Sequence, residues 1–397
     1  MDSLGPRILF YSHDAYGMGN IRRTLAMCEH LVKTIPHASI LILTGSPVVH
    51  SLRMPGRVDY VKLPCLTREA SESFTTKYWT MSVQELTAIR ADLILSAVRN
   101  FKPDLVIVDK KPMGIKKEFF GALNWIRKHL PATRVILGLR DILDEPEATI
   151  PVWQKNRYFE VIETYYDGVW IFGDPVVFDA VREYRMPASV AQKTHYTGYL
   201  IKPQIESNRL QIRTALGLNG GLFSVVMAGG GGDGFPIMKT YVETAKQNGH
   251  KSHHIDSLLL TGPEMSPDQR EQVAAWCSNG LPVRHQEFTD EIENLLIAAD
   301  VVVSMGGYNS TCEILAYRKK AVVIPRVHPV KEQYLRAKRL AEMGLISMIH
   351  PDELSPTKLQ HAIEHTAKQK HMFDHIEDKI NLNGLQGVEQ LTKALLV

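Results

Sequence analysis

The chain has 397 residues, of which 44% are hydrophobic and 22% are charged, and its formal net charge at pH 7 is +3. This length predicts two domains, and the near-neutral charge gives no case for nucleic-acid binding. The four cysteines form no CxxC pair, so neither a zinc site nor a disulfide framework is indicated, and a reducing cytoplasm is expected. No apolar run approaches the roughly 20 residues of a membrane helix, and the N-terminus has no signal-peptide pattern.

Strands and helices alternate through most of the first 200 residues, which predicts a largely parallel sheet. Short apolar runs predict the strands, and apolar residues at helical spacing predict the helices. The predicted strands are 7–12, 39–43, 58–63, 104–108, 134–139 and 168–172, and the predicted helices are 21–33, 83–101, 117–129 and 152–165. Residues 65–80 are predicted to form a long polar loop, typical of a lid, a binding loop or a mobile connection.

The loop at 13–20 joins the first strand to the first helix, where parallel sheets bind ligands. It lacks the GxGxxG spacing of dinucleotide-binding proteins. His13 and Asp14 stand at the strand end and are candidates for a general base. Alternatively, His13 only satisfies a hydrogen bond there.

Two further strand ends in this half carry charged residues. Asp141 follows the strand at 134–139 and is a candidate site carboxylate, although Arg140 could instead pair with it or with Asp144. Four lysines gather after the strand at 104–108: Lys110, Lys111, Lys116 and Lys117. They make either a solvated face or a contact for an anionic acceptor or a lipid surface.

The second half repeats the alternation. Its predicted strands are 222–227, 256–260, 283–286, 301–304, 321–324 and 345–349, and its predicted helices are 235–247, 267–277, 290–298, 332–343, 355–368 and 388–396. A further helix is predicted to start at a cap provided by Asn309 or Ser310 and to end near Tyr317.

Four consecutive glycines, Gly229 to Gly232, separate a predicted strand from a predicted helix. Backbone N–H groups and the helix dipole at such a turn suit a diphosphate. The turn is not a P-loop, because the Gly-Lys-Ser/Thr ending is missing. The alternative is a merely flexible loop.

The stretch 300–336 carries the most informative motif, a strand, a glycine turn, a helix and a strand. Gly306 and Gly307 would let a ligand approach the backbone closely. Glu313 lies about one turn into the helix, where its carboxylate could accept two hydrogen bonds from a ribose diol. Alternatively, Glu313 only favours its helix N-terminus and the glycines only make a turn.

This stretch resembles the C-terminal half of the MurG-like glycosyltransferases, which carry Gly-Gly, then Asn-Ser-Thr-x-Glu, then Pro and Glu-Gln-Tyr-x-x-Ala. The resemblance implies the α/β GT-B fold, with two Rossmann-like domains of mostly parallel sheets facing across a cleft. It implies an acceptor-side domain at 1–199, a donor-side domain at 200–385, and a terminal helix at 386–397 that packs back on the first domain.

The resemblance also implies roles for individual residues. Glu313 would hold the ribose of a nucleotide-sugar, Glu332 and Gln333 would bind sugar hydroxyls, and Phe288 would cover the nucleobase unless it is a core residue. The full expected donor set is Gly229, Gly230, Gly231, Gly232, Phe288, Thr289, Gly306, Gly307, Asn309, Ser310, Glu313, Glu332, Gln333 and Arg336. Many family members have Asn at the position of Arg336, which leaves the sugar open.

In the same family the first loop often reads Gly-x-Gly-His-x-x-Arg and faces the acceptor. The matching residues here are Gly17, Met18, Gly19, Asn20 and Arg23. Asn20 replaces the usual histidine, and asparagine cannot act as a general base. The expected catalytic residues are therefore His13, Asp14 and Asp141.

The predicted function is transfer of a hexosyl or N-acetylhexosaminyl group from a nucleotide diphosphate-sugar. A UDP-sugar is favoured, with GDP- and dTDP-sugars open, and no metal is required because no Asp-x-Asp motif is present. The acceptor would be a small molecule or lipid-linked, and the enzyme cytoplasmic, with or without contact to the inner face of the membrane. The alternatives are a nucleotide-sugar hydrolase or epimerase, or a catalytically silent nucleotide-sugar-binding protein.

Overall fold

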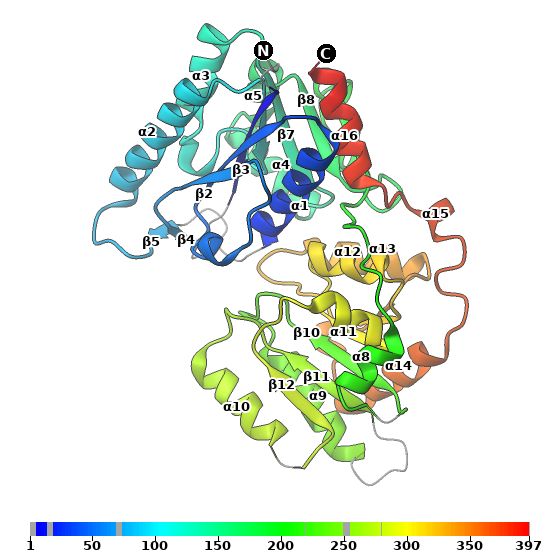
Figure 1. Cartoon of the computed structure of the whole chain (residues 1–397). Coiled ribbons are helices and arrows are strands. Elements are labelled where there is room, and N and C mark those ends of the chain that lie inside the picture. The colour runs from blue at the N-terminus through cyan, green and yellow to red at the C-terminus, as the bar shows by residue number, and fades with distance from the viewer. Residues whose placement is uncertain are drawn as a thin grey trace. The chain divides into compact units, whose positions relative to one another are not determined.

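A computed structural model of the chain describes residues 5–13, 19–68, 74–218, 220–248, 255–278 and 280–396. Its contacts divide the chain into two compact units (Figure 1). The first comprises 1–200 and 380–397, and the second comprises 201–379.

The first unit is built on a seven-stranded, fully parallel sheet in the order β3-β2-β1-β6-β7-β8-β9. Its strands are β1 (Arg7–Ser12), β2 (Ser39–Thr44), β3 (Val58–Lys62), β6 (Leu105–Asp109), β7 (Arg134–Arg140), β8 (Gly168–Phe172) and β9 (Thr194–Tyr196). The strand order reverses between β1 and β6. In doubly wound sheets a ligand binds at such a reversal, beyond the carboxyl ends of the strands.

Helices cover both faces of this sheet, which is why its central strands, β1, β6, β7 and β8, are buried along nearly their whole length. Leu9, Val106 and Leu137 face one side, where they pack with α2 (Val83–Phe101), α3 (Phe120–His129) and α5 (Tyr158–Tyr165). On the other side α1 (Gly19–Thr34) and α16 (Gly384–Leu395) lie against each other (Figure 1). The remaining helical elements are η1 (Val49–Ser51), η2 (Ile115–Lys117), α4 (Pro146–Lys155), α6 (Ala180–Glu183) and α7 (Ala188–Ala191).

Two predictions for this unit are wrong in detail. The helix predicted at 152–165 is two helices, α4 and α5, because Arg157 takes a left-handed φ of 53° at the junction. The loop predicted at 65–80 contains a small antiparallel pair, β4 (Leu66–Arg68) and β5 (Phe74–Thr76). Phe74 is 7% exposed and packs with Leu66 and Leu86, so this part of the segment has a small core of its own.

The second unit has a six-stranded parallel sheet in the order β12-β11-β10-β13-β14-β15, again reversing beside its first strand. Its strands are β10 (Phe223–Met227), β11 (Asp256–Leu260), β12 (Val283–Gln286), β13 (Val301–Ser304), β14 (Ala321–Val323) and β15 (Ser347–Met348). Its helices are α8 (Arg209–Ala215), α9 (Phe235–Asn248), α10 (Pro267–Cys277), α11 (Ile292–Ala298), α12 (Tyr308–Ala316), α13 (Glu332–Glu342), η3 (Pro351–Glu353), α14 (Pro356–Lys368) and α15 (Ile376–Lys379).

The chain leaves and re-enters the first unit through two adjacent segments. Tyr199 N–H donates to the carbonyl of Asn381, and Gly384 N–H donates to the carbonyl of Tyr199, both at 2.9 Å. Gly384 and Gly387 let α16 approach closely, since a Cβ on either would lie 2.5 Å from a carbonyl oxygen, of Tyr199 or of Thr197. No described helix is long and apolar enough to cross a membrane.

Candidate functional site

In the second unit, the turns after β10 and β13 flank the point where the strand order reverses. These are the predicted glycine turn at 229–232 and the predicted Gly306-Gly307 turn. Both turns therefore stand where doubly wound sheets bind their ligands.

The glycine turn is shaped by close contact with the turn that follows β11. A Cβ on Gly231 would lie 2.0 Å from the carbonyl oxygen of Thr261, and one on Gly230 would lie 2.6 Å from a carboxylate oxygen of Glu264. Glu264 N–H in turn donates to the carbonyl of Gly230 at 2.7 Å. The turn is thus a packed element and not merely a flexible loop.

This packing leaves backbone donors at the turn. The amides of Gly231 and Gly234 close the turn by donating to Ala228 and Gly231. Within the described ranges, the amides of Gly229, Gly230 and Gly232 donate no hydrogen bond to a backbone carbonyl. At the start of α9, Pro236 has no N–H and the amide of Ile237 donates to the carbonyl of Gly234, so Phe235 contributes the one further backbone donor. These amides form a set of donors suited to an anion.

The second turn brings the start of α12 to the same edge of the sheet. Gly306 has a φ of +70°, and a Cβ there would lie 2.7 Å from a methyl group of Val323, so only glycine fits without movement. The N-cap residue is Gly307, and no side chain caps the helix. The predicted capping by Asn309 or Ser310 is wrong, because both lie inside the first turn of α12.

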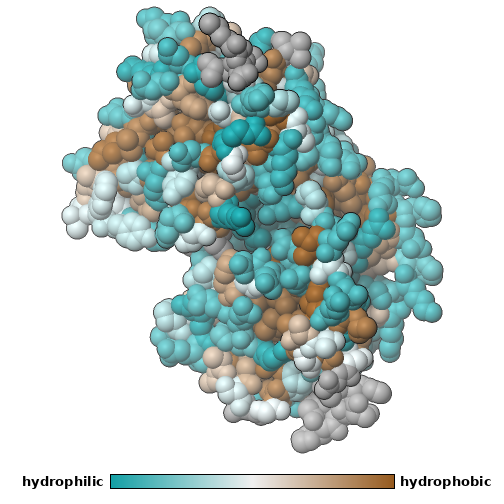
Figure 2. Space-filling model, viewed as in Figure 1, coloured by the Kyte–Doolittle hydropathy of each residue, from teal (hydrophilic) through white to brown (hydrophobic). Residues whose placement is uncertain are grey.

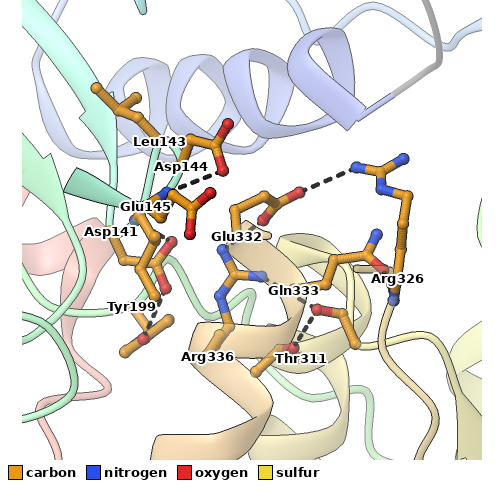
Figure 3. A network of polar contacts seen from close by, with 12 residues as sticks. Asp141, Leu143, Asp144, Glu145, Tyr199, Thr311, Arg326, Glu332, Gln333 and Arg336 are labelled. Carbon is orange, nitrogen blue, oxygen red and sulfur yellow. Dashed lines mark hydrogen bonds and ion pairs between the residues drawn. The ribbon is translucent and has the colours of Figure 1, made fainter. Parts of the chain in front are cut away.

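Buried charges connect this turn to α13 (Figure 3). Arg336 is fully buried, donates to the carbonyl of Gly306 at 3.1 Å and pairs with Glu332 at 2.9 Å. The other oxygen of Glu332 lies 3.4 Å from Arg326, whose second terminal nitrogen lies 3.2 Å from Asp233. A chain of charges therefore runs from the glycine turn through α13 to the turn after β13.

Gln333 also contributes to this network. Its side-chain oxygen accepts a hydrogen bond from the backbone N–H of Arg326 at 3.0 Å, and its amide nitrogen lies near Gly307. The expected sugar-binding residues Glu332 and Gln333 are thus buried and already held by protein groups. Their position is fixed before any ligand arrives.

The residues expected to hold the nucleoside lie on neighbouring elements. Glu313 is half-buried on α12. Phe288 is 48% exposed, so it is not a core residue. Thr289 accepts a hydrogen bond from the backbone N–H of Glu291 at 3.0 Å, just before α11.

In the first unit, the reversal between β1 and β6 is bridged by a buried ion pair. Arg23, on α1, donates to Asp109, at the end of β6, at 2.7 Å. The side chain of Asn20 donates to the carbonyl of His13 and accepts from Arg23 at 3.2 Å. Gly19 begins α1, while Asp14, Gly17 and Met18 lie outside the described residues.

The two described candidates for a base differ in their surroundings. His13 is 5% exposed, and its backbone N–H lies 3.4 Å from a carboxylate oxygen of Asp109. Asp141 is 1% exposed, and its two oxygens accept from the backbone of Ile142 and the hydroxyl of Tyr199, both at 2.8 Å (Figure 3). Through these contacts Asp141 holds Tyr199, which lies at the point where the chain leaves the unit.

Comparison with known proteins relates the second half of the chain to one family. Residues 225–391 match the glycosyltransferase family 28 C-terminal domain. Most of this match lies in the second unit, and its last residues, 380–391, belong to the first. The predicted resemblance to MurG-like proteins is therefore confirmed.

Two relatives of the chain have the same enzyme name. A UDP-N-acetylglucosamine–N-acetylmuramyl-(pentapeptide) pyrophosphoryl-undecaprenol N-acetylglucosamine transferase from Glaesserella parasuis is 30% identical over 144 residues, 36% of this chain and 38% of that protein. The transferase of that name from Alkaliphilus oremlandii is 22% identical over 87% of this chain and 86% of its own. The chain thus spans well under two thirds of the first of these relatives.

Solved structures support the fold. MurG from Acinetobacter baumannii superposes with a TM-score of 0.62 at 11% identity, covering 98% of this chain and 99% of its own. The UDP-GlcNAc 2-epimerase from Neisseria meningitidis gives a TM-score of 0.62 at 14% identity, covering 98% of both chains. The predicted GT-B fold, with two parallel-sheet α/β units, is confirmed.

Sequence reasoning missed two groups of residues in this MurG-like protein. Arg326 and Asp233 join the network in the second unit, and their only sequence signal was their place after a strand and inside the glycine turn. In the first unit, Glu118 accepts from Tyr11 at 2.6 Å and from Arg90 at 2.5 and 2.6 Å. Burial, followed by the charge of Glu118, raises the pKa of Tyr11 well above its ordinary value.

The Tyr11–Glu118–Arg90 triad holds the predicted lysine cluster in place. Tyr11 also accepts from the backbone N–H of Ile115 at 3.0 Å. Around that residue Lys110, Lys116 and Lys117 all have left-handed φ, between 48° and 69°. Such backbone strain persists only where surrounding contacts enforce it. The described residues contain no group of three or more His, Cys, Asp or Glu placed to hold a metal ion.

Proposed function

We propose that this protein is a glycosyltransferase that takes a sugar from a nucleotide diphosphate-sugar bound by the second unit. The observation that carries the proposal is the coincidence of the family 28 domain with two donor-rich turns at the reversal of its sheet. The backbone amides of Gly229, Gly230 and Gly232 and the uncapped start of α12 would bind the diphosphate. Glu313 would accept from the ribose, and Phe288 would contact the base.

The same donor groups would assist the reaction. Negative charge grows on the diphosphate as its bond to the sugar breaks, and fixed N–H groups stabilise charge at low cost of reorganisation. Glu332 and Gln333 would hold the sugar with the groups not used by Arg326 and Arg336. A UDP-sugar, with an N-acetylhexosamine as the first candidate, is favoured because the named relatives use UDP-N-acetylglucosamine.

We assign acceptor binding to the first unit. His13 and Asp14 remain the proposed source of the base, because Asp109 and Asp141 are each held in buried contacts. The side chain of Asn20 links His13 to Arg23 through two hydrogen bonds. This structural role does not require a basic side chain.

A lipid-linked acceptor fits the surface of this unit. Lys111 and Lys116 of the lysine cluster lie 5.8 and 5.7 Å from the ring centroid of Phe74. The unit also exposes apolar side chains, Trp79 at 49% and Ile89 and Leu93 of α2 at 36% and 38%. Figure 2 shows apolar surface gathered over this part of the unit. Cations beside exposed aromatic and aliphatic side chains favour contact with an anionic lipid surface.

The test is incubation with UDP-, GDP- and dTDP-sugars, each with and without a polyprenyl-diphosphate-linked acceptor, with analysis of all products. Sugar transfer that requires the acceptor supports the proposal. Free sugar or a changed sugar without acceptor identifies a hydrolase or an epimerase. Binding without turnover under all conditions identifies a silent nucleotide-sugar-binding protein.

A further inference from the structure

Arg326 lies on the loop next to the Gly306-Gly307 turn and contacts the glycine turn on the other side of it. It follows the end of β14, and β13 lies between β14 and β10 in the sheet. A contact from Arg326 to Asp233, on the turn after β10, therefore joins the loops on either side of the Gly306-Gly307 turn. The guanidinium thus contacts the residue that directly follows the glycines whose backbone donors the proposed function assigns to a diphosphate.

The contacts of Arg326 are long for charged groups. Its terminal nitrogens lie 3.2 Å from Asp233 and 3.4 Å from Glu332, whereas charge-assisted hydrogen bonds usually measure about 2.7–2.9 Å. Its Nε is buried, yet within the described chain it makes no hydrogen bond. The side chain is 26% exposed, so a ligand can reach it.

Arg336 provides an internal comparison. It is fully buried and makes hydrogen bonds of 2.9 and 3.1 Å to Glu332 and to Gly306. Of the two arginines that contact Glu332, Arg336 therefore uses its donors within the protein. Arg326 retains unused donor capacity, because a guanidinium carries five N–H groups.

Arg326 attracts an arriving anion, whereas Asp233 repels it. Its side chain is 45% exposed and lies next to the glycine turn, so its charge repels a phosphate there. A phosphate that binds Arg326 must compete with this carboxylate. Arg–phosphate pairs can be bidentate, which favours the exchange.

We propose that Arg326 binds the diphosphate of the donor and that Asp233 holds the arginine in place beforehand and competes with the ligand for it. This inference rests on the proposed function of the second unit. It adds a specific cation to a site otherwise made of backbone N–H groups. It also assigns an opposing role to a carboxylate at the same site.

The test is calorimetric titration of the full chain with UDP and with uridine. Arg326→Ala should weaken UDP binding by about 10- to 100-fold, the range expected for hydrogen bonds to a charged group, and leave uridine binding unchanged. Asp233→Asn should strengthen UDP binding by about 3- to 10-fold, since it removes a like charge near the phosphates. In the Arg326→Ala background Asp233→Asn should give a smaller gain, because only the repulsion remains to be removed and the competition for Arg326 is already gone.

Arg339→Ala, which removes an exposed arginine of α13, is the matched control and should leave UDP affinity unchanged. Unchanged UDP affinity in folded Arg326→Ala overturns the inference, as does weaker UDP binding in Asp233→Asn. Should Arg326→Ala fail to fold, Arg326→Gln, which keeps hydrogen-bonding groups but removes the charge, should show the loss of UDP affinity instead, and an unchanged affinity in folded Arg326→Gln overturns the inference. Wild-type protein that binds none of UDP, GDP and dTDP overturns the proposed function itself.

Discussion

Arg23 and Asp109 form an ion pair with an N–O distance of 2.7 Å, and their side chains are only 2% and 8% exposed. The pair connects α1 to the end of β6 across the point where the strand order of the first unit reverses. Losing one member would leave the other buried without its counter-charge.

Asp109→Ala should therefore lower the free energy of unfolding by about 3–5 kcal/mol, the usual cost of an orphaned buried charge. Denaturant unfolding followed by circular dichroism measures it. Glu183→Ala, which removes an exposed ion pair with Arg182, is the control and should change stability by less than about 0.5 kcal/mol. A loss for Asp109→Ala no larger than that of the control would show that the pair is not needed.

Glu313→Ala should weaken nucleoside diphosphate binding by about 1.5–3 kcal/mol, the range for hydrogen bonds to a charged group. The side chain is half-buried on α12, so the variant should still fold. Calorimetry with UDP and with 2′,3′-dideoxy-UDP checks the reason as well as the size. The variant should lose affinity for UDP only, and equal losses for both ligands would argue against a ribose contact.

Gly229 is the position at which a side chain can be added to the glycine turn without a clash, so that it blocks access of a phosphate. Its φ is +64°, and an added Cβ would meet nothing within 4 Å, whereas Gly230 and Gly231 are packed against the neighbouring turn. Gly229→Asn should fold, since asparagine tolerates left-handed φ, and should weaken UDP binding by about tenfold while sparing uridine. Gly231→Val should instead destabilise the unit, because the carbonyl of Thr261 occupies its space. If uridine and UDP weaken equally in Gly229→Asn, the turn does not contact phosphate.

His13→Ala should lower turnover by at least about 100-fold, the lower end for general acid–base catalysis, with little change in UDP affinity. Asp14→Asn serves as the parallel variant, since both residues follow β1. The readouts are the rate of acceptor-dependent transfer and the UDP dissociation constant. Full turnover in both variants would move the base elsewhere or support a reaction without a protein base.

Lys319 should make the second unit respond to alkaline pH. Burial, helped by the charge of Arg209, lowers the pKa of its ammonium group to about 8 from an ordinary 10.5. Between these values the unfolded chain holds a proton that the folded chain has released, so the contribution of Lys319 to stability rises with pH. Below pH 8 both states are protonated, and the cost of burying the charge is fully present.

The stability of wild type relative to Lys319→Met should thus be constant below about pH 8 and rise by at most about 3 kcal/mol by pH 10.5. Denaturant unfolding at a series of pH values measures it. Lys33→Met, at an exposed position on α1, gives the baseline. A difference that stays flat or falls with pH would contradict the expected protonation of Lys319.

Local pattern was enough for most of the fold. The uninterrupted apolar strands and the turns after β10 and β13 are encoded within a few residues, so local residue order alone places Gly229 to Gly232 and Gly306 at strand ends. The break at Arg157 could not be predicted in this way, because no residue beside it forbids a continuous helix, and arginine rarely takes the left-handed φ found there.

The candidate site was harder to predict wherever it depends on distant partners. Arg326 and Asp233 are 93 residues apart, and only the strand order brings them together. Likewise, Asn309 and Ser310 are suitable caps by type, but the turn at Gly306 starts the helix earlier and leaves them inside it. Residue type suggested the chemistry, whereas topology decided which groups meet.

The return of α16 to the first unit has a consequence for biosynthesis. The second unit, 201–379, is an insertion in the first, and its two ends are adjacent at Tyr199 and Asn381. During translation the insert emerges complete while its host still lacks the helix that packs on α1. The first unit therefore begins translation first but completes its fold last. Until α16 is made, the face of α1 that contacts it is uncovered and can bind other chains.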